Sequence, residues 1–175
     1  MNKLTNLNKI YNREHQHTLT TLSNSDLISI CIKLKMKLLG VYMKDELNNN
    51  VIQGNYIINL QNHNENGSHW TAFIKDKNNI YYYDSFGVFP PQNEYDIFRK
   101  ESDNIYYNTS HHQNIDSTSC VWFCIAFLYY RNTTKGPMLN RFKNFDKKIT
   151  SNTVKNEKVL QKYIDNIYFK KKIIV

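Results

Sequence analysis

The feature that most constrains the fold is an apolar run at residues 120–130, CVWFCIAFLYY. Its length allows about three helical turns and it has no polar stripe, which indicates a helix that is buried on all sides. It is shorter than the roughly 20 apolar residues that cross a bilayer. A helix of this kind needs other elements packed around it. Because a chain of 175 residues with 41% hydrophobic residues can supply one such core, we predict a single domain over residues 1–175.

Extended and helical patterns alternate along the rest of the chain. Aromatic and β-branched residues between polar turns predict strands at residues 56–60, 69–74, 79–86 and 104–108. Apolar residues at helical spacing predict further helices at residues 23–40, 94–100 and 159–167. Residues 1–21 have no clear period and are interpreted as an irregular lead-in. We therefore predict an α+β fold, with a small, mainly antiparallel sheet packed against the buried helix.

The net charge of +8 is concentrated at the C-terminal end of the chain. Residues 1–130 carry 11 basic and 12 acidic residues, whereas residues 131–175 carry 12 basic and 3 acidic residues. Such a basic segment is either a solvated helix face or a surface that contacts phosphates. DNA is therefore a candidate partner of residues 131–175. No apolar run is long enough to predict a membrane partner.

Three cysteines are too few for a disulfide framework, so we expect free thiols in a reducing compartment. Cys120 is the informative one, because it follows a polar loop and begins the buried helix, where the helix dipole stabilises a thiolate. Cys120 is thus a candidate nucleophile, although a cysteine here could also serve only for packing. Cys31 and Cys124 lie in apolar patterns and are interpreted as packing residues. No set of metal ligands surrounds Cys120 and Cys124 in the sequence, so we expect no metal.

A thiol nucleophile needs a base, a group that orients the base, and donors for the oxyanion. His69 begins one expected strand and Asp84 ends the next, so their side chains can meet across the hairpin. Gln113 lies in the loop before Cys120, where its amide N–H could join the backbone N–H of Cys120 as an oxyanion donor. Alone, each of these residues could equally be a strand residue, a turn acceptor or a loop amide. The other histidines are interpreted as solvated loop residues: His15, His17, His63, His111 and His112.

Taken together and in order, three segments resemble a known family of proteases. The segments GSHWTAFI, YYYDSFG and QNIDSTSCVWFC are similar to those of the adenovirus-type (adenain-like) cysteine proteases, which are related to the proteases that process ubiquitin-like modifiers. The likeness is closest to the maturation proteases of virophages, Polinton-like elements and large DNA viruses, and it covers roughly residues 22–130. One departure is Val121, because relatives usually have Gly directly after the nucleophile.

The resemblance implies a role for each candidate residue. Cys120 would be the nucleophile, His69 the general base, Asp84 the acid that orients it and Gln113 an oxyanion donor. Trp70 would help to form the substrate groove, although a strand aromatic could equally belong to the core. No metal or other cofactor is required by this chemistry, but the resemblance permits activation by a peptide or by DNA.

The activity that the resemblance implies is that of a cysteine endopeptidase, a thiol-dependent hydrolase that cleaves viral structural precursor proteins during virion maturation. We expect a monomer that acts in the virion and the host cytoplasm (viral factory). The N-terminal sequence has no charged-then-apolar signal pattern, so we do not expect secretion. Two alternatives stay open: a deubiquitinating or desumoylating protease, and a non-enzymatic DNA-binding virion protein on a degenerate protease fold.

Overall fold

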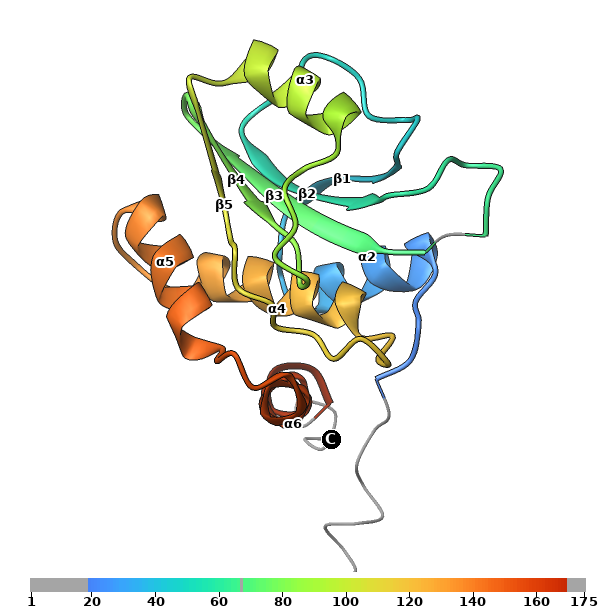
Figure 1. The fold of residues 1–175 in the computed structure, drawn as a ribbon, viewed down its shortest axis with the longest axis vertical. Coiled ribbons are helices and arrows are strands. Elements are labelled where there is room, and N and C mark those ends of the chain that lie inside the picture. The colour runs from blue at the N-terminus through green and yellow to red at the C-terminus, as the bar shows by residue number, and fades with distance from the viewer. Residues whose placement is uncertain (1–18, 67, 170–175) are drawn as a thin grey trace, which may run out of the picture.

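The computed structural model describes residues 19–66 and 68–169, which form an α+β fold with a mixed five-stranded sheet and five α-helices (Figure 1). The sheet has the strand order β1-β2-β3-β4-β5, in which sequence neighbours are also neighbours in space. Its strands are β1 (Leu38–Met43), β2 (Gly54–Asn59), β3 (Trp70–Asp76), β4 (Asn79–Tyr83) and β5 (Asn104–Tyr107). All four predicted strands are confirmed, with ends that differ by up to three residues, and β1 is an additional strand.

The sheet is not mainly antiparallel, so that part of the prediction was wrong. Strand β3 pairs antiparallel with β2 and β4, but β1 pairs parallel with β2 and β4 pairs parallel with β5. A parallel neighbour requires a connection that carries the chain back along the sheet. Helix α3 (Gln92–Glu101) provides this return between β4 and β5, and the loop of residues 44–53 provides it between β1 and β2.

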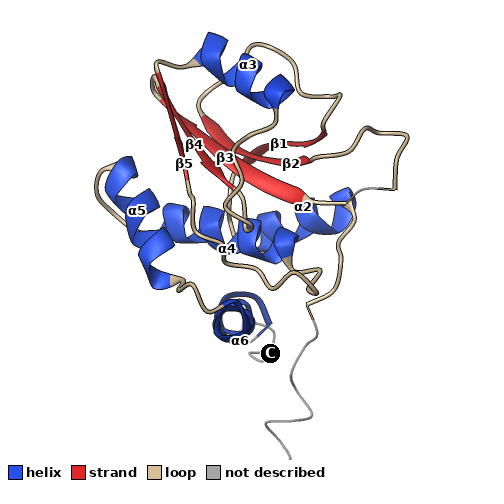
Figure 2. Cartoon of the chain, viewed as in Figure 1, coloured by secondary structure: helices blue, strands red, loops and turns tan. Residues whose placement is uncertain are grey.

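The helices cover both faces of the sheet in layers (Figure 2). Helix α3 lies on one face, while α2 (Asn24–Lys33) and α4 (Cys120–Thr133) lie on the other. Helix α6 (Thr153–Ile164) packs on the side of α4 that faces away from the sheet and continues into a π-helical turn, Asp165–Phe169. Helix α5 (Met138–Lys148) packs beside α4 and also contacts β4, through Phe142 on Tyr81 and Phe145 on Tyr83. The predicted burial of the helix over residues 120–130 is confirmed, because α4 lies between two layers.

Strands β3 and β4 are buried on both faces, which explains their nearly continuous apolar sequences. Successive side chains of a strand point to opposite faces. Ile74 and Tyr83 therefore belong to the core against α4, whereas Phe73 and Tyr82 belong to a second core against α3. Both strands lie at the centre of the sheet, and the candidate catalytic residues flank their ends.

The predicted helix over residues 23–40 is too long at its C-terminal end. Ser23 caps α2 together with Asp26, as the sequence suggested, but the helix ends at Lys33. Lys35 takes a positive φ of 55°, which turns the chain out of the helix and into β1. Gly40 lies inside β1, where a Cβ atom would come within 2.2 Å of the Tyr42 ring. Gly40 therefore leaves space for the Tyr42 ring, and it does not end a helix.

The C-terminal segment contains one more helix than the sequence predicted. The expected helix over 159–167 is observed as α6 and the turn that follows it, but α5 was missed. Met138, Phe142 and Phe145 are buried at spacings of four and three residues, which is a helical signal that could have been found. Residues 1–18 of the expected lead-in lie outside the described residues. No helix in the described ranges is long and apolar enough to cross a membrane.

Candidate active site

The hairpin of β3 and β4 brings His69 and Asp84 together. His69 directly precedes β3 and Asp84 directly follows β4, so both lie at the same end of the hairpin. His69 Nε2 lies 2.9 Å from Asp84 Oδ1. The side chains are 15% and 3% exposed, which shields the pair from bulk water. The expected meeting of these two residues is therefore observed.

The turn that follows β4 aims the Asp84 carboxylate. Asp84 Oδ1 also accepts the backbone N–H of Phe86 at 2.7 Å, and the N–H of Gly87 donates to the Asp84 carbonyl at 2.9 Å. Gly87 has a φ of 71°, and a Cβ atom there would lie 2.8 Å from the carbonyl oxygen of Ser110. Only glycine fits this turn without displacing the loop at Ser110. The predicted strand over 79–86 ends early because the sequence DSFG forms this turn.

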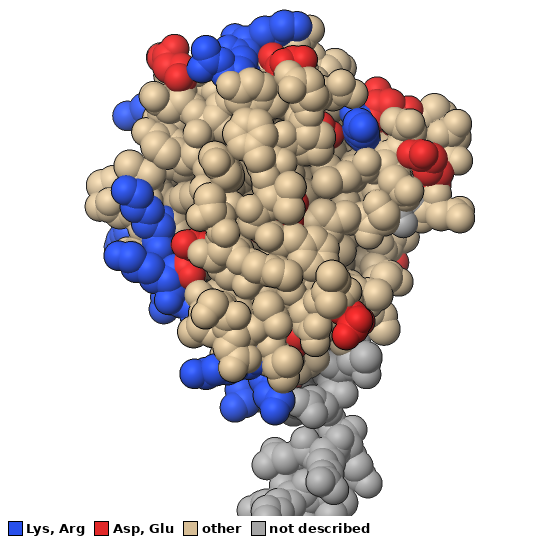
Figure 3. Space-filling model, viewed as in Figure 1, with Lys and Arg blue, Asp and Glu red and all other residues tan. Residues whose placement is uncertain are grey.

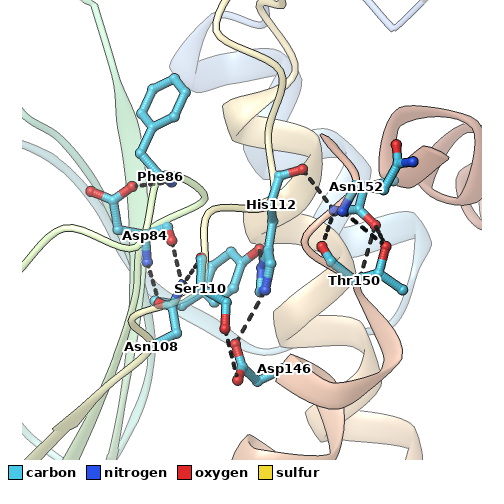
Figure 4. A network of polar contacts seen from close by, with 10 residues as sticks. Asp84, Phe86, Asn108, Ser110, His112, Asp146, Thr150 and Asn152 are labelled. Atoms are coloured by element: carbon cyan, nitrogen blue, oxygen red, sulfur yellow. Dashed lines mark hydrogen bonds and ion pairs between the residues drawn. The ribbon is translucent and has the colours of Figure 1, made fainter. Parts of the chain in front are cut away.

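Asn108 fixes the backbone of Asp84 and was not found from the sequence. Its Nδ2 donates to the Asp84 carbonyl at 2.7 Å, and its Oδ1 accepts the Asp84 N–H at 2.9 Å (Figure 4). Asn108 is buried, and it directly follows β5, the parallel neighbour of β4. An asparagine after a short strand gives no distinguishing signal in a sequence this rich in asparagine.

Cys120 is the first residue of α4, and it lines the same groove as His69. Because His69 Nε2 is directed at Asp84, the other ring nitrogen, Nδ1, is the one available to the thiol. Burial disfavours a charged imidazole, but the hydrogen bond with Asp84 and the nearby Cys120 outweigh it and raise the pKa of His69 to about 9. At neutral pH His69 is therefore protonated, and it lines the groove together with Cys120 at the start of α4.

The other two cysteines have different surroundings. Cys124 lies one helical turn after Cys120, is fully buried and donates its thiol to the Trp70 carbonyl at 3.3 Å. Burial raises the pKa of Cys124 well above its ordinary value, and burial also raises that of Cys31, to about 12. Both residues therefore belong to the core, in agreement with their interpretation as packing residues.

Gln113 is held beside Cys120 by the same turn that aims Asp84. Ser85 Oγ donates to Gln113 Oε1 at 2.7 Å, and the Gln113 N–H donates to the Ser85 carbonyl at 3.0 Å. Gln113 Nε2 donates one hydrogen to the Ser117 carbonyl at 2.7 Å, and its second hydrogen can serve another acceptor. The N–H of Cys120, at the first position of a helix, has no acceptor inside that helix. These two donors line the same pocket.

The pocket beside Cys120 is a groove of about 540 Å³. Trp70 and Val121 form part of its apolar lining, and His69 and Glu65 are the charged residues among the described residues that line it. Trp70 is also 9% exposed and part of the main core, so this residue lies both in the groove lining and in the core. The volume and the mixture of apolar and polar lining fit a groove that holds an extended peptide.

His112 is not the solvated loop residue that the sequence suggested; it is completely buried. Its Nδ1 lies 3.0 Å from the hydroxyl of Tyr83, and its Nε2 lies 3.2 Å from Asp146 Oδ1, in an alignment that is not a hydrogen bond (Figure 4). Of the remaining histidines, His63 is exposed and paired with Asp45, and His111 is exposed. His15 and His17 lie outside the described residues.

Comparisons with known proteins add no family assignment. No protein-family model matches the sequence, and a search of curated proteins finds no match. Within residues 19–66 and 68–169, no group of three or more His, Cys, Asp and Glu side chains is arranged to hold a metal ion. The chemistry of the site therefore has to be argued from its own geometry.

Proposed function

We propose that this protein is a cysteine endopeptidase of the adenovirus-protease-like class. The observation that carries the proposal is the placement of three residues: Cys120 lies at a helix N-terminus and shares a groove with His69, and His69 Nε2 lies 2.9 Å from Asp84. An activated nucleophile with an oriented base is the minimum requirement for acyl transfer. A groove that could hold a peptide runs past the thiol.

The proposed reaction has two steps. The Cys120 thiolate attacks the carbonyl carbon of a peptide bond, the His69 imidazolium gives its proton to the leaving amine, and a thioester forms. A water molecule then loses a proton to His69 and attacks the thioester, which releases the acid and restores the Cys120 thiolate beside protonated His69. Gln113 Nε2 and the Cys120 N–H stabilise the oxyanion in both steps, and such a donor contributes about 10²- to 10³-fold to kcat.

The proposed substrates are viral structural precursor proteins, cleaved during virion maturation in the virion or the viral factory of the host cytoplasm. This part of the proposal is supported by the resemblance of the segments around His69, Asp84 and Cys120 to the adenain-like proteases. The same resemblance favours small residues, glycine above all, near the scissile bond. The proposed enzyme works as a monomer without a metal.

Cleavage of a peptide library is the direct test of this function. We expect the wild-type protein to generate new peptide termini, identified by mass spectrometry, and both Cys120→Ala and His69→Ala to abolish them. His63→Ala is the matched control, because His63 is an exposed histidine that is also paired with an aspartate. Ubiquitin-like fusions are added as separate substrates, and a preference for them would replace virion maturation by deubiquitination or desumoylation. If no substrate is cleaved, with DNA and peptides present as activators, the proposal is wrong.

DNA binding is a second candidate function, favoured by the position of the basic residues. Lys and Arg side chains gather along one edge of the molecule and at its lower end in Figure 3, where α5 and α6 lie in Figure 1. The exposed lysines of these helices are Lys143, Lys147, Lys148, Lys155, Lys158 and Lys162. We expect DNA affinity to fall steeply with salt, and to fall further when Lys147 and Lys148 are replaced by Glu. Cys120→Ala is expected to leave DNA binding unchanged. Affinity that does not depend on salt would contradict this second function.

A further inference from the structure

Two consecutive residues of α6 hold the loop that carries Gln113. Asn156 Nδ2 donates to the His112 carbonyl at 3.0 Å, and the Asn114 N–H donates to Glu157 Oε1 at 3.1 Å. Gln113 lies between the two residues that are held. The C-terminal segment thus contacts the backbone on each side of the candidate oxyanion donor.

Glu157 also contacts the other end of this loop, next to the nucleophile. Ser119 Oγ donates to Glu157 at 2.8 and 3.0 Å from its two carboxylate oxygens. Ser119 is the residue before Cys120 and occupies the N-cap position of α4, yet its side chain makes no capping hydrogen bond. An N-cap serine normally accepts an N–H of the first turn. Here the Ser119 side chain binds Glu157, and the start of α4 is left free to face the groove.

Asn156 is itself fixed, so it can act as a rigid support. Its side chain is buried, its Oδ1 accepts the Thr150 N–H at 3.0 Å, and its Nδ2 also donates to the Thr150 carbonyl at 2.6 Å. Figure 4 shows these contacts of Thr150 beside His112. Leu160 and Ile164 of the same helix are buried in the core that contains α4. The helix that carries both contacts is therefore anchored independently of the loop.

We propose that Asn156 and Glu157 are positioning residues for the oxyanion donors, so that the C-terminal segment is part of the catalytic architecture. The inference rests on the proposed cysteine peptidase function and extends it to a segment outside the family resemblance. Neither residue touches the groove. Glu157 acts through Asn114 and Ser119, and Asn156 acts through His112.

The expected effect of Glu157→Ala is a loss of acyl transfer without an equal loss of thiol reactivity. A displacement of about 1 Å in a catalytic group can cost about 10²-fold in rate. We expect kcat to fall about 10- to 100-fold in Glu157→Ala, with KM changed much less. Glu157→Gln keeps an acceptor oxygen for Asn114 or Ser119 and should restore most of the rate.

The experiment compares two reagents for Cys120 in the same variants. With p-nitrophenyl acetate, Sγ attacks the acetyl carbonyl, p-nitrophenolate leaves and a thioester forms, so this reaction passes through an oxyanion. Iodoacetamide is attacked at its methylene carbon with loss of iodide, so no oxyanion forms. We expect Glu157→Ala to slow acylation and to leave alkylation near the wild-type rate. Lys158→Ala, an exposed neighbour on α6, is the matched control and should change neither rate.

Amide hydrogen exchange of residues 113–119 provides a readout that does not require catalysis. We expect faster exchange in this loop in Glu157→Ala, with slower exchange restored in Glu157→Gln. If Glu157→Ala does not fold, Ser119→Ala removes the Ser119–Glu157 contact from the loop side and should give the same pattern to a smaller extent, because the Asn114 contact remains. Wild-type rates of both acylation and exchange in these variants would overturn the inference. An unreactive Cys120 in the wild type would instead contradict the proposed function, while the exchange data would still decide the role of Glu157.

Discussion

Two of the histidine–aspartate pairs in the described residues have a shielded histidine but different surroundings. In the first, His69 Nε2 is 2.9 Å from Asp84, and the other side of the ring meets the Cys120 thiol and an open groove. In the second, His112 Nε2 is 3.2 Å from Asp146, and the other nitrogen meets the hydroxyl of Tyr83 inside the core. An aspartate is common to both pairs, so the group near the second ring nitrogen distinguishes a pair that can do chemistry from one that only holds elements together.

The two pairs are connected to each other through the loop that carries Gln113. Asn108 holds Asp84 and also donates to the Ser110 carbonyl at 3.2 Å. Ser110 Oγ in turn donates to Asp146 at 3.3 Å (Figure 4). The second pair thus supports the backbone that positions the first. This arrangement predicts that mutations of the two histidines affect different measured quantities.

Replacement of His69 is expected to have the largest effect. His69→Ala removes the base and the positive charge beside Cys120, so peptide hydrolysis should fall on the order of 10⁴-fold. The thermal unfolding midpoint should change far less than the rate. The measurement is kcat/KM on a cleaved peptide, together with calorimetry of the same sample. A variant that keeps a tenth of the wild-type rate would remove the distinction between the two pairs.

Replacement of His112 is expected to lower the free energy of unfolding rather than the reactivity of Cys120. His112→Ala leaves a cavity in the core and a buried Tyr83 hydroxyl without its partner, which should cost about 2–4 kcal/mol of unfolding free energy. Urea titration measures this change. Cys120 in the fraction that stays folded should still be alkylated quickly. Unchanged stability would show that the buried pair does not hold the loop to α5.

A smaller effect of His69 is expected in the pH dependence of the unfolding free energy. The pKa of His69 is raised from its ordinary 6.5 to about 9, so protonated His69 stabilises the folded state fully below pH 6.5. That stabilisation is lost as the pH rises from 6.5 to about 9. His69→Ala should lack the stability loss that is specific to this group. An unfolding free energy whose pH dependence is the same in both proteins would contradict the assignment.

The smallest effect is expected at a third pair, His63 and Asp45. Both side chains are largely in contact with water, at 67% and 34% exposure, and pairs of this kind contribute little. His63→Ala should match the wild type in melting temperature, alkylation rate and hydrolysis. A clear loss in any of these would mean that burial does not rank the three pairs.

Much of the fold was predictable because the elements that form the core have clear apolar patterns in the sequence. The run beginning at Cys120 predicted a buried helix and the patterns around Phe73 and Tyr82 predicted strands, and the structure contains both. Strand β1 could not be predicted, because all its residues are half-buried and its position depends on Lys35 leaving the helical region. The parallel pairs depend on the path of the connections, which periodicity does not describe.

The candidate site likewise contains residues that the sequence could predict and residues that it could not. His69, Asp84, Gln113 and Cys120 could be selected because each has the chemistry of a role and because, in this order, the segments around them resemble those of a known protease family. Their supports could not be selected: Asn108 and Glu157 have common side chains on a loop and a basic helix, and only distance in space connects them to the site. His112 was interpreted wrongly because its neighbours in sequence are polar while its neighbours in space are Tyr83 and Asp146.

The most direct test of the central claim is the rate at which each cysteine reacts with iodoacetamide near neutral pH. Intact mass and peptide mapping would be compared for the wild type, His69→Ala and His112→Ala. We predict that Cys120 reacts fast in the wild type and in folded His112→Ala, slows in His69→Ala, and always exceeds Cys31 and Cys124, whose pKa values are raised by burial. If Cys120 reacts no faster than those two, or equally fast without His69, the thiolate–imidazolium pair does not exist and the proposed function fails with it.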